Sequence, residues 1–240
     1  MNIIYEDDYV IVCEKPAGVP SQSDRTSDYD MVNQLKNYRY EKEGKGNPYI
    51  GLVHRLDRPV GGVMVFGKTP YATKELNQQI QQHQMKKKYV AIVIKDLSSE
   101  LTDGVKRLEH YLVKDGRTNL SQITTKQNPN GKKAILNYEV VEVKECLDEG
   151  ILSLVDIELL TGRHHQIRVQ LSQISDGIWG DTKYNKTFQN KKTWTNVALY
   201  SYSLTFLHPK TKKSVTFYQL PIAKPFSLFE QELAELITNK

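Results

Sequence analysis

Alternating apolar and polar residues recur along most of the chain, and this pattern predicts strands more often than helices. Residues 2–5 and 9–14 alternate on either side of the polar residues 6–8, which predicts an N-terminal hairpin. Residues 49–53 and 62–67 predict two further strands, and the segment between them interrupts the pattern. Any chemistry in that segment therefore belongs to a loop between strands.

Helical periodicity is limited to a few segments. Apolar residues recur at helical spacing over 31–40 and 228–237. Thr69, followed by a proline, predicts an N-cap and a helix that ends near residue 83. A short helix is expected to start at residues 161–163, where a glycine permits a tight turn.

The central and C-terminal parts of the chain return to the strand pattern. Strands are expected over residues 89–94, 108–113, 120–125, 134–143 and 151–159, followed by a closing pair over 196–207 and 214–220. Many strands with short connections predict an α+β fold around a mixed, largely antiparallel central sheet with flanking helices. Because no repeat or linker divides the chain, residues 1–240 are expected to form one domain.

Composition argues against a disordered chain, a disulfide-rich secreted protein and a membrane protein. With 240 residues, of which 39% are hydrophobic, the chain can bury a full core. A net charge of +5 favours an anionic partner only weakly, and the basic clusters at 86–88, 132–133, 191–192 and 210–213 are each typical of a solvated surface. Two cysteines give no disulfide framework, and no leader or membrane span is evident, so we expect a cytoplasmic protein.

Asp57 lies in the loop between the two strands expected over 49–53 and 62–67, with Arg55 and Arg58 as neighbours. Nearby cations favour the charged form of a carboxylate, and a fixed anion beside a sugar carbon can act as a nucleophile or a base. On residue types alone, a surface ion pair is the commoner explanation. A wider motif is needed to decide between them.

Glycine, arginine and histidine residues crowd the expected helix start in the segment 161–168, a setting that attracts phosphate. The segment is therefore a candidate for holding RNA backbone. A metal site is the alternative, but the adjacent His164 and His165 would point about a hundred degrees apart on a helix. No carboxylate follows at ligand spacing, so we expect no metal.

Tyr89 follows three lysines, Lys86, Lys87 and Lys88. An aromatic ring beside cations suits a base stacked over a phosphate path. A tyrosine inside a strand is more often a core residue. The residue types alone leave both interpretations open.

Several short motifs follow one another in a fixed order along the chain. They are His54-Arg55-Leu56-Asp57-Arg58 followed by residues 62–68; an opening hairpin with a Lys-Pro-Ala-Gly loop in residues 3–18; Lys87-Lys88-Tyr89; residues 162–168; Gly180-Asp181 with Lys183-Tyr184; and residues 204–209. In this order they resemble the motifs of the RluA-type pseudouridine synthase family over nearly the whole chain. Because several independent motifs are more specific than any one of them, the resemblance outweighs the surface ion pair as an explanation of Asp57.

The resemblance implies the pseudouridine synthase fold with a catalytic cleft, and an enzyme that isomerises uridine to pseudouridine in structured RNA without a cofactor. It implies that Asp57 is the essential carboxylate, that Arg168 is its ion-pair partner and keeps it ionised, and that Tyr89 packs its ring against the target uracil. Whether Asp57 attacks the ribose or removes a proton, and whether Tyr89 is a base or only stacks, stays open. The implied RNA-binding residues are His54, Arg55, Arg58, Lys88, Arg163, His165 and Gln166.

The resemblance also sets expectations about the substrate. RNA is the expected partner, with ribosomal RNA slightly favoured over transfer RNA by the habit of the family, and the protein is expected to act as a monomer. Because the resemblance begins at Met1, no N-terminal S4-like RNA-binding module is expected. Two departures concern the loop beside Asp57: Val60-Gly61 replaces a common Thr-Ser, and Gly67 replaces a common alanine.

Two other functions compete with this interpretation. A hydrolase of a glycosidic bond usually needs a second carboxylate, whereas the Asp57 motif offers arginines. A catalytically silent RNA-binding or RNA-folding protein would need only the basic surface. Conversion of a labelled uridine transcript by the purified protein, and its loss in Asp57→Ala, would distinguish the synthase from both.

Overall fold

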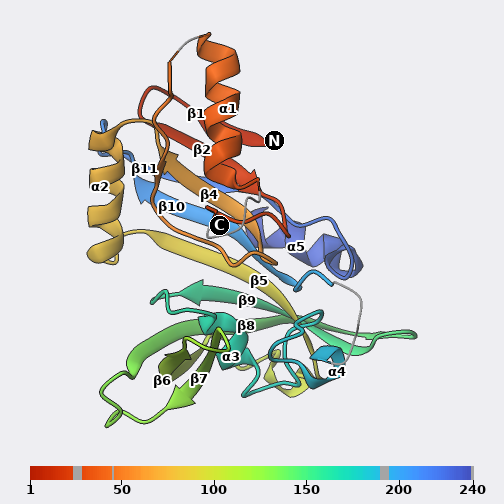
Figure 1. Cartoon of the computed structure of the whole chain (residues 1–240). Helices are drawn as coiled ribbons and strands as arrows, with labels where there is room; N and C mark the ends of the chain where they lie inside the picture. Colours follow the sequence, from red (N-terminus) through yellow and green to blue (C-terminus); the bar gives the residue numbers. More distant parts are fainter. Residues whose placement is uncertain (24–28, 45, 190–194, 239–240) are drawn as a thin grey trace. The chain divides into compact units, whose positions relative to one another are not determined.

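The chain forms two compact units in the computed structural model (Figure 1). The first contains Met1–Lys86 and Ser201–Gln219, and the second contains Lys87–Tyr200 and Leu220–Lys240. Each unit has its own strands and helices, and the expectation of one domain stays a prediction. The structure describes residues 1–23, 29–44, 46–189 and 195–238.

The first unit is built on strands in the order β1-β2-β4-β10, with β3 paired to β4 and β11 paired to β10. The pairs β1–β2, β2–β4, β3–β4 and β10–β11 are all antiparallel. Helices α1 and α2 accompany these strands (Figure 1). The elements are β1 (Ile3–Glu6), β2 (Val10–Lys15), α1 (Met31–Glu43), β3 (Gly51–Leu52), β4 (Gly61–Gly67), α2 (Pro70–Gln81), β10 (Leu199–Leu207) and β11 (Ser214–Tyr218).

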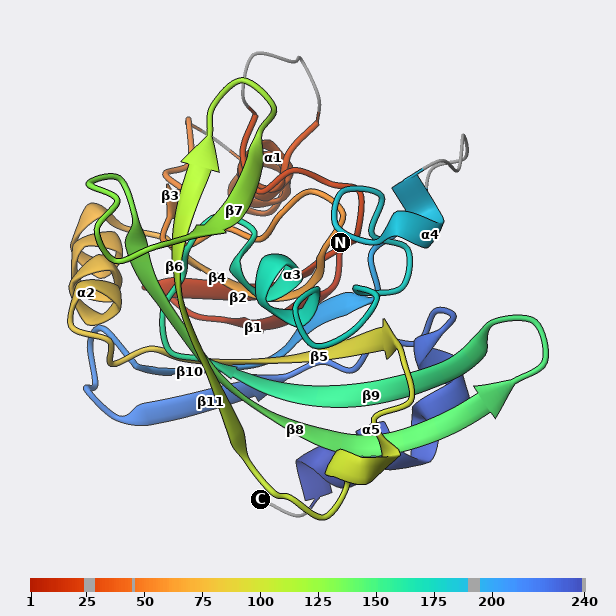
Figure 2. The ribbon, with the colours of Figure 1, turned by 90° about the horizontal axis from the view of Figure 1, so that it is seen from below.

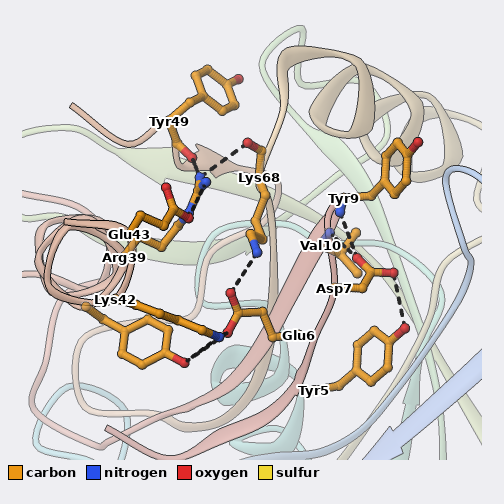
Figure 3. Close-up of polar contacts among 11 residues, drawn as sticks. Tyr5, Glu6, Asp7, Tyr9, Val10, Arg39, Lys42, Glu43, Tyr49 and Lys68 are labelled. Atoms are coloured by element: carbon orange, nitrogen blue, oxygen red, sulfur yellow. Dashed lines mark hydrogen bonds and ion pairs between the residues drawn. The ribbon is translucent and has the colours of Figure 1, made fainter. Parts of the chain in front are cut away.

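Local sequence signals explain where these elements begin. The Asp7 carboxylate accepts hydrogen bonds of 2.8 Å from the backbone N–H groups of Tyr9 and Val10, which fixes the turn of the predicted hairpin (Figure 3). The Thr69 hydroxyl accepts a hydrogen bond from the Ala72 N–H, as the predicted N-cap of α2. The hairpin, both helices of this unit and the closing pair β10–β11 are confirmed.

Ion pairs of Glu6 on β1 connect helix α1 to the strands of the first unit. Its carboxylate oxygens lie 2.7 Å from the Nζ atoms of Lys42 on α1 and Lys68 after β4 (Figure 3). Burial alone would raise the pKa of Glu6, but hydrogen bonds from Lys42, Lys68 and Tyr38 overcome this effect and lower the pKa to about 2. The Glu6 carboxylate therefore stays charged at neutral pH.

The apolar core of the first unit joins β2, β4, α2 and β10. Because side chains alternate along a strand, every second residue of β2 and β4 enters this core. Its buried members are Val10, Val12, Val63, Val65, Leu76, Met85, Leu204 and Phe206. This packing holds β4, the strand that follows the loop with Asp57.

The second unit has the strand order β5-β9-β8-β6-β7, and all of these neighbours are antiparallel. Figure 2 shows the short helix α3 over the concave side of β8 and β9. The elements are β5 (Lys86–Ile94), η1 (Ser98–Glu100), β6 (Lys106–Asp115), β7 (Leu120–Thr124), β8 (Lys132–Cys146), β9 (Gly150–Leu159), α3 (Gln166–Leu171), α4 (Lys186–Gln189), η2 (Phe226–Phe229) and α5 (Glu230–Thr238).

The predicted α+β class and the largely antiparallel arrangement are confirmed, but several element boundaries were wrong, among them the starts of β5 and α3. Strand β5 starts at Lys86 instead of residue 89, because Lys88 pairs with Glu158 of β9 and its ammonium forms an ion pair with Asp156. Helix α3 starts at Gln166, because His165 adopts a left-handed backbone conformation with φ of 53°. A helix cannot continue through that conformation.

Candidate active site and RNA-binding residues

Asp57 lies in the loop between β3 and β4 of the first unit, as predicted, and is partly exposed. The preceding residue, Leu56, is buried and anchored at both backbone groups by Ser21. The Ser21 hydroxyl accepts a hydrogen bond of 3.1 Å from the Leu56 N–H and donates one of 2.9 Å to the Leu56 carbonyl. After Asp57 the loop turns back, since the Val60 N–H donates to the Asp57 carbonyl over 3.0 Å. The backbone on both sides of the carboxylate is therefore fixed.

A fully buried lysine joins the Lys-Pro-Ala-Gly loop to the Asp57 loop. The Lys15 ammonium donates to the carbonyls of Val19, Pro16 and Arg58 over 2.6, 3.0 and 3.2 Å. Burial lowers the pKa of Lys15 to about 7, and the charge of Asp57 opposes that change. The ammonium therefore ties the backbone of residue 58, next to Asp57, to the Lys-Pro-Ala-Gly loop.

Replacing Lys15 with Met removes this ammonium, and the effect on stability should depend on pH. The pKa of Lys15 falls from its ordinary value of 10.5 to about 7 on folding, so the unfolded chain binds the extra proton between these values. The free energy of unfolding of the wild type, relative to Lys15→Met, should therefore rise by about 1.4 kcal/mol per pH unit between about pH 7 and the ordinary pKa of 10.5. Urea unfolding of both proteins at several pH values tests this. A difference that does not change with pH would contradict it.

Two of the positions that depart from the family pattern, Gly67 and Val60, have local explanations. Gly62, which matches the pattern, has a φ of 134°, and a Cβ atom there would lie 2.4 Å from the Ser201 carbonyl oxygen, so only glycine fits. A Cβ atom on Gly67 would lie 2.1 Å from the Thr73 hydroxyl oxygen, which explains why alanine is absent. Val60 is 2% exposed and fills the core instead of offering a hydroxyl.

The basic residues around Asp57 divide into a buried and an exposed group. His54 is buried, and its Nε2 accepts a hydrogen bond of 3.2 Å from the Val65 N–H, so it ties the loop to β4. Arg55 and Arg58 are exposed, and the Arg58 Nε donates to the Gly18 carbonyl over 3.0 Å. The two arginines are therefore accessible to a ligand.

Tyr89 and Lys88 lie on β5 of the second unit. Tyr89 is only 5% exposed and pairs with Ile157 of β9. The Lys88 ammonium lies 2.8 Å from a carboxylate oxygen of Asp156. The ring of Tyr89 is therefore held within the packed part of the strand.

Arg168 on α3 forms a buried ion pair with Asp181. Its Nε and Nη2 donate to the two carboxylate oxygens of Asp181, each over 2.7 Å. The side chains are 3% and 0% exposed, and the guanidinium lies 5.2 Å from the centre of the Tyr184 ring. Asp181 also accepts hydrogen bonds from the backbone N–H groups of Lys183 and Tyr184. This two-point contact fixes the plane of the guanidinium.

The expectation that His164 and His165 point apart on a helix was wrong. Both precede α3, and their rings stack with centres 3.7 Å apart. The Tyr184 hydroxyl accepts a hydrogen bond from the Ser121 N–H and lies 2.8 Å from Nδ1 of His165, to which it can donate its proton. Burial, followed by the charge of Arg168, lowers the pKa of His165 to about 2. His165 is therefore neutral at physiological pH.

Gln166 and Arg163 hold the segment that leads into α3. The Gln166 side-chain oxygen accepts from the Thr161 hydroxyl and the Arg163 N–H, and its amide nitrogen donates to the Ile135 carbonyl over 3.0 Å. Gln166 is buried, whereas Arg163 is exposed and its Nε donates to the Lys133 carbonyl over 2.9 Å.

The structure adds three residues that the site predictions did not include: Lys15, Asp181 and Tyr184. Each lies in a sequence segment that the family resemblance had singled out, but residue type gave them no function. The structure assigns them to supporting contacts. Asp57 lies on the first unit and Tyr89 and Arg168 on the second, so their joint action on one nucleotide stays a prediction.

Comparison with known families decides which proteins this chain is related to. The model of the RNA pseudouridylate synthase family matches residues 9–173. The chain belongs to this family. The match contains Asp57, Tyr89 and Arg168, and it confirms the resemblance derived from the sequence motifs and the prediction of an enzyme family.

Individual members of the RNA pseudouridylate synthase family agree with this assignment. The chain is 32% identical to a ribosomal large subunit pseudouridine synthase C from Buchnera aphidicola subsp. Baizongia pistaciae, over 89% of this chain and 64% of that protein. It is 26% identical to a tRNA pseudouridine synthase C from Haemophilus influenzae, over 90% of this chain and 91% of that protein. The structure of human RNA pseudouridylate synthase domain containing 1 superposes with a TM-score of 0.76 at 20% identity, covering 99% of this chain and 93% of that one, which confirms the fold.

Two further features of the structure concern groups of metal ligands and membrane-spanning helices. Among the residues with a described position, no three His, Cys, Asp or Glu side chains are grouped as metal ligands. No helix in the described part of the chain is both long and apolar enough to cross a membrane. The basic cluster 191–192 lies outside the described residues.

Proposed function

We propose that this chain isomerises uridine to pseudouridine in RNA, with Asp57 as the essential carboxylate. The observation that carries the proposal is the family match over residues 9–173, which contains Asp57. The anchored backbone around Asp57 supports it, because a carboxylate that acts on a sugar carbon must be held in place.

The proposed reaction needs no external reactant. The bond between the uracil nitrogen and the ribose carbon breaks, the base turns, and a carbon of the base bonds to the same ribose carbon. That base carbon loses its proton, and the released nitrogen gains one. The target nucleotide must leave its stack first, at a cost of a few kcal/mol that contacts to the RNA backbone must offset.

We propose that Arg168 keeps Asp57 ionised and that Asp181 positions Arg168. A guanidinium has five N–H donors and can serve two carboxylates at once. Asp181 binds Nε and Nη2 of Arg168 and is itself held by two backbone N–H groups. This buried arrangement supports a fixed direction for the positive charge.

We propose that the Tyr89 ring packs against the target uracil and that its hydroxyl takes part in removing the proton from the carbon of the new bond. Replacing Tyr89 with Phe keeps the ring and removes only the hydroxyl. The rate of pseudouridine formation should then fall by about a hundredfold, with RNA affinity unchanged. Release of tritium from that carbon of uridine in RNA measures the rate. Full activity in Tyr89→Phe would show that the ring only stacks.

We propose Arg55, Arg58 and Arg163 as direct RNA contacts, because all three are exposed. The exposed part of Lys88 adds a further cation on β5. The other RNA-binding candidates, His54, His165 and Gln166, are buried. Their proposed role in RNA binding is indirect, because their hydrogen bonds hold the loops in which they lie.

We propose ribosomal RNA as the substrate, ahead of transfer RNA, and a monomer acting in the cytoplasm. The relative with 32% identity is named for the large ribosomal subunit, whereas the one named for tRNA is 26% identical. The test compares unmodified ribosomal RNA and transfer RNA transcripts as substrates of the purified protein. Pseudouridine in the ribosomal transcript supports the proposal. Free uracil would indicate a hydrolase, and binding without conversion would indicate a silent RNA-binding protein.

A further inference from the structure

The second unit contains a cavity of about 410 Å³ beside α3. Its wall comes from the β6–β7 hairpin, the start of β8 and the segment before α3. Neither Tyr89 nor Arg168 lines it. The lining residues are Leu112, Val113, Lys114, Ser121, Asn130, Lys132, Gly162, Arg163 and His164.

Four cations surround this cavity, and we call them the pocket cations. Three of them line it, and the fourth, on β5, lies at its edge, since its Nζ is 3.9 Å from the position of a Cβ atom on Gly162. No acidic side chain forms an ion pair with any of the four among the residues that the structure describes. The pocket cations are Lys87, Lys114, Lys132 and Arg163.

Other lysines of the same unit differ in this respect. Lys106 pairs with Asp103 over 2.7 Å, and Lys144 pairs with Glu232 over 2.7 Å. Acidic partners are therefore available on this unit but are not placed at the cavity. Burial lowers the pKa of Lys87, which is half-buried, so its charge is held there at a cost in free energy. An anionic ligand would remove that cost.

The remaining wall suits a nucleotide. Leu112 and Val113 offer apolar surface, and Asn130 offers an amide that can both donate and accept hydrogen bonds. Ser121 Oγ lies 2.8 Å from Nδ1 of His164, which holds that ring against the cavity. A cavity of this size lies within the range of small-molecule sites, and proteins commonly recognise RNA by placing an unstacked base in such a pocket.

We propose that this cavity binds one unstacked nucleotide of single-stranded RNA, with the phosphates on either side of it held by the pocket cations. The inference rests on the proposed function for its biological meaning, since it makes the cavity a substrate-recognition site. Because neither Tyr89 nor Arg168 lines it, the nucleotide bound there is a different one from the uridine that is isomerised.

The test measures binding of a fluorescent oligocytidine RNA at several salt concentrations. This probe has the phosphate backbone but no uridine, so binding is read without turnover. In Lys114→Gln/Lys132→Gln, affinity should fall roughly tenfold near physiological salt, and the slope of log affinity against log salt should become shallower by about 1.4, or ~0.7 per lost phosphate contact. The matched control is Lys106→Gln/Lys144→Gln, which loses the same charge and should bind nearly as the wild type does.

A second pair of variants avoids the removal of lysines. Gly162 has space for a side chain, with its nearest neighbour the Lys87 ammonium, so Gly162→Asp should fold and place a carboxylate among the pocket cations. Gly116, on the turn between β6 and β7, also has open space, and Gly116→Asp adds the same charge outside the cavity. Gly162→Asp should lose oligocytidine affinity, and Gly116→Asp should retain it.

The outcomes separate this inference from the proposed function. If the wild type modifies uridine but both cavity variants bind oligocytidine as their controls do, the cavity is not a nucleotide site and the inference is overturned. If the cavity variants lose affinity while the wild type modifies no uridine in either transcript, the proposed function fails and the nucleotide site stands.

Discussion

Replacing Asp57 with Asn should lower the rate of pseudouridine formation by at least about a hundredfold, and by up to about 10⁴-fold, without weakening RNA binding. The amide has nearly the size of the carboxylate but lacks its negative charge. The backbone contacts that hold the loop belong to Leu56, Val60 and Arg58, so they should survive the substitution. Tritium release from uridine in the transcript measures the rate, and filter binding measures the affinity.

The matched control is Asp8→Asn, since Asp8 is an exposed aspartate of the same unit in the turn between β1 and β2. It should keep the wild-type rate. An Asp57→Asn enzyme with a rate within about threefold of the wild type would refute the role of Asp57, because loss of a reacting group has a much larger effect.

Replacing Asp181 with Ala should lower the free energy of unfolding by about 3–5 kcal/mol, because it leaves the buried Arg168 without its acidic partner. The control Asp176→Ala removes an exposed aspartate of the same unit and should change stability by no more than about 0.5 kcal/mol. Urea unfolding monitored by circular dichroism provides the measurement.

The double variant Arg168→Met/Asp181→Leu separates stability from catalysis. Two apolar side chains of similar volume remove both buried charges, so most of the lost stability should return. Pseudouridine formation should not return, since the guanidinium proposed to face Asp57 is absent. A double variant as unstable as Asp181→Ala would show that the contacts of Asp181 with the backbone N–H groups of Lys183 and Tyr184 account for the loss. Recovery of activity would contradict the role of Arg168.

Several elements could be predicted because their signals are local. The hairpin of β1 and β2 follows from alternation around Asp7, and the start of α2 follows from Thr69 before a proline. The loop position of Asp57 follows from the interruption between two apolar strands. In each case neighbouring residues in the sequence make the interactions that define the element.

The sequence by itself determined the order of the strands and of the longer helices, the motifs and therefore the family, because these depend on residue types at short spacing. It did not predict the short helices η1, α4 and η2. Only the tertiary structure decided which distant groups meet. Arg168 binds Asp181, Lys15 binds the carbonyl of Arg58, and Lys87 lies beside Gly162. Such contacts join residues whose spacing along the chain has no fixed relation to their distance in space. Burial then sets the electrostatics of each charged group, and burial is a property of the folded chain.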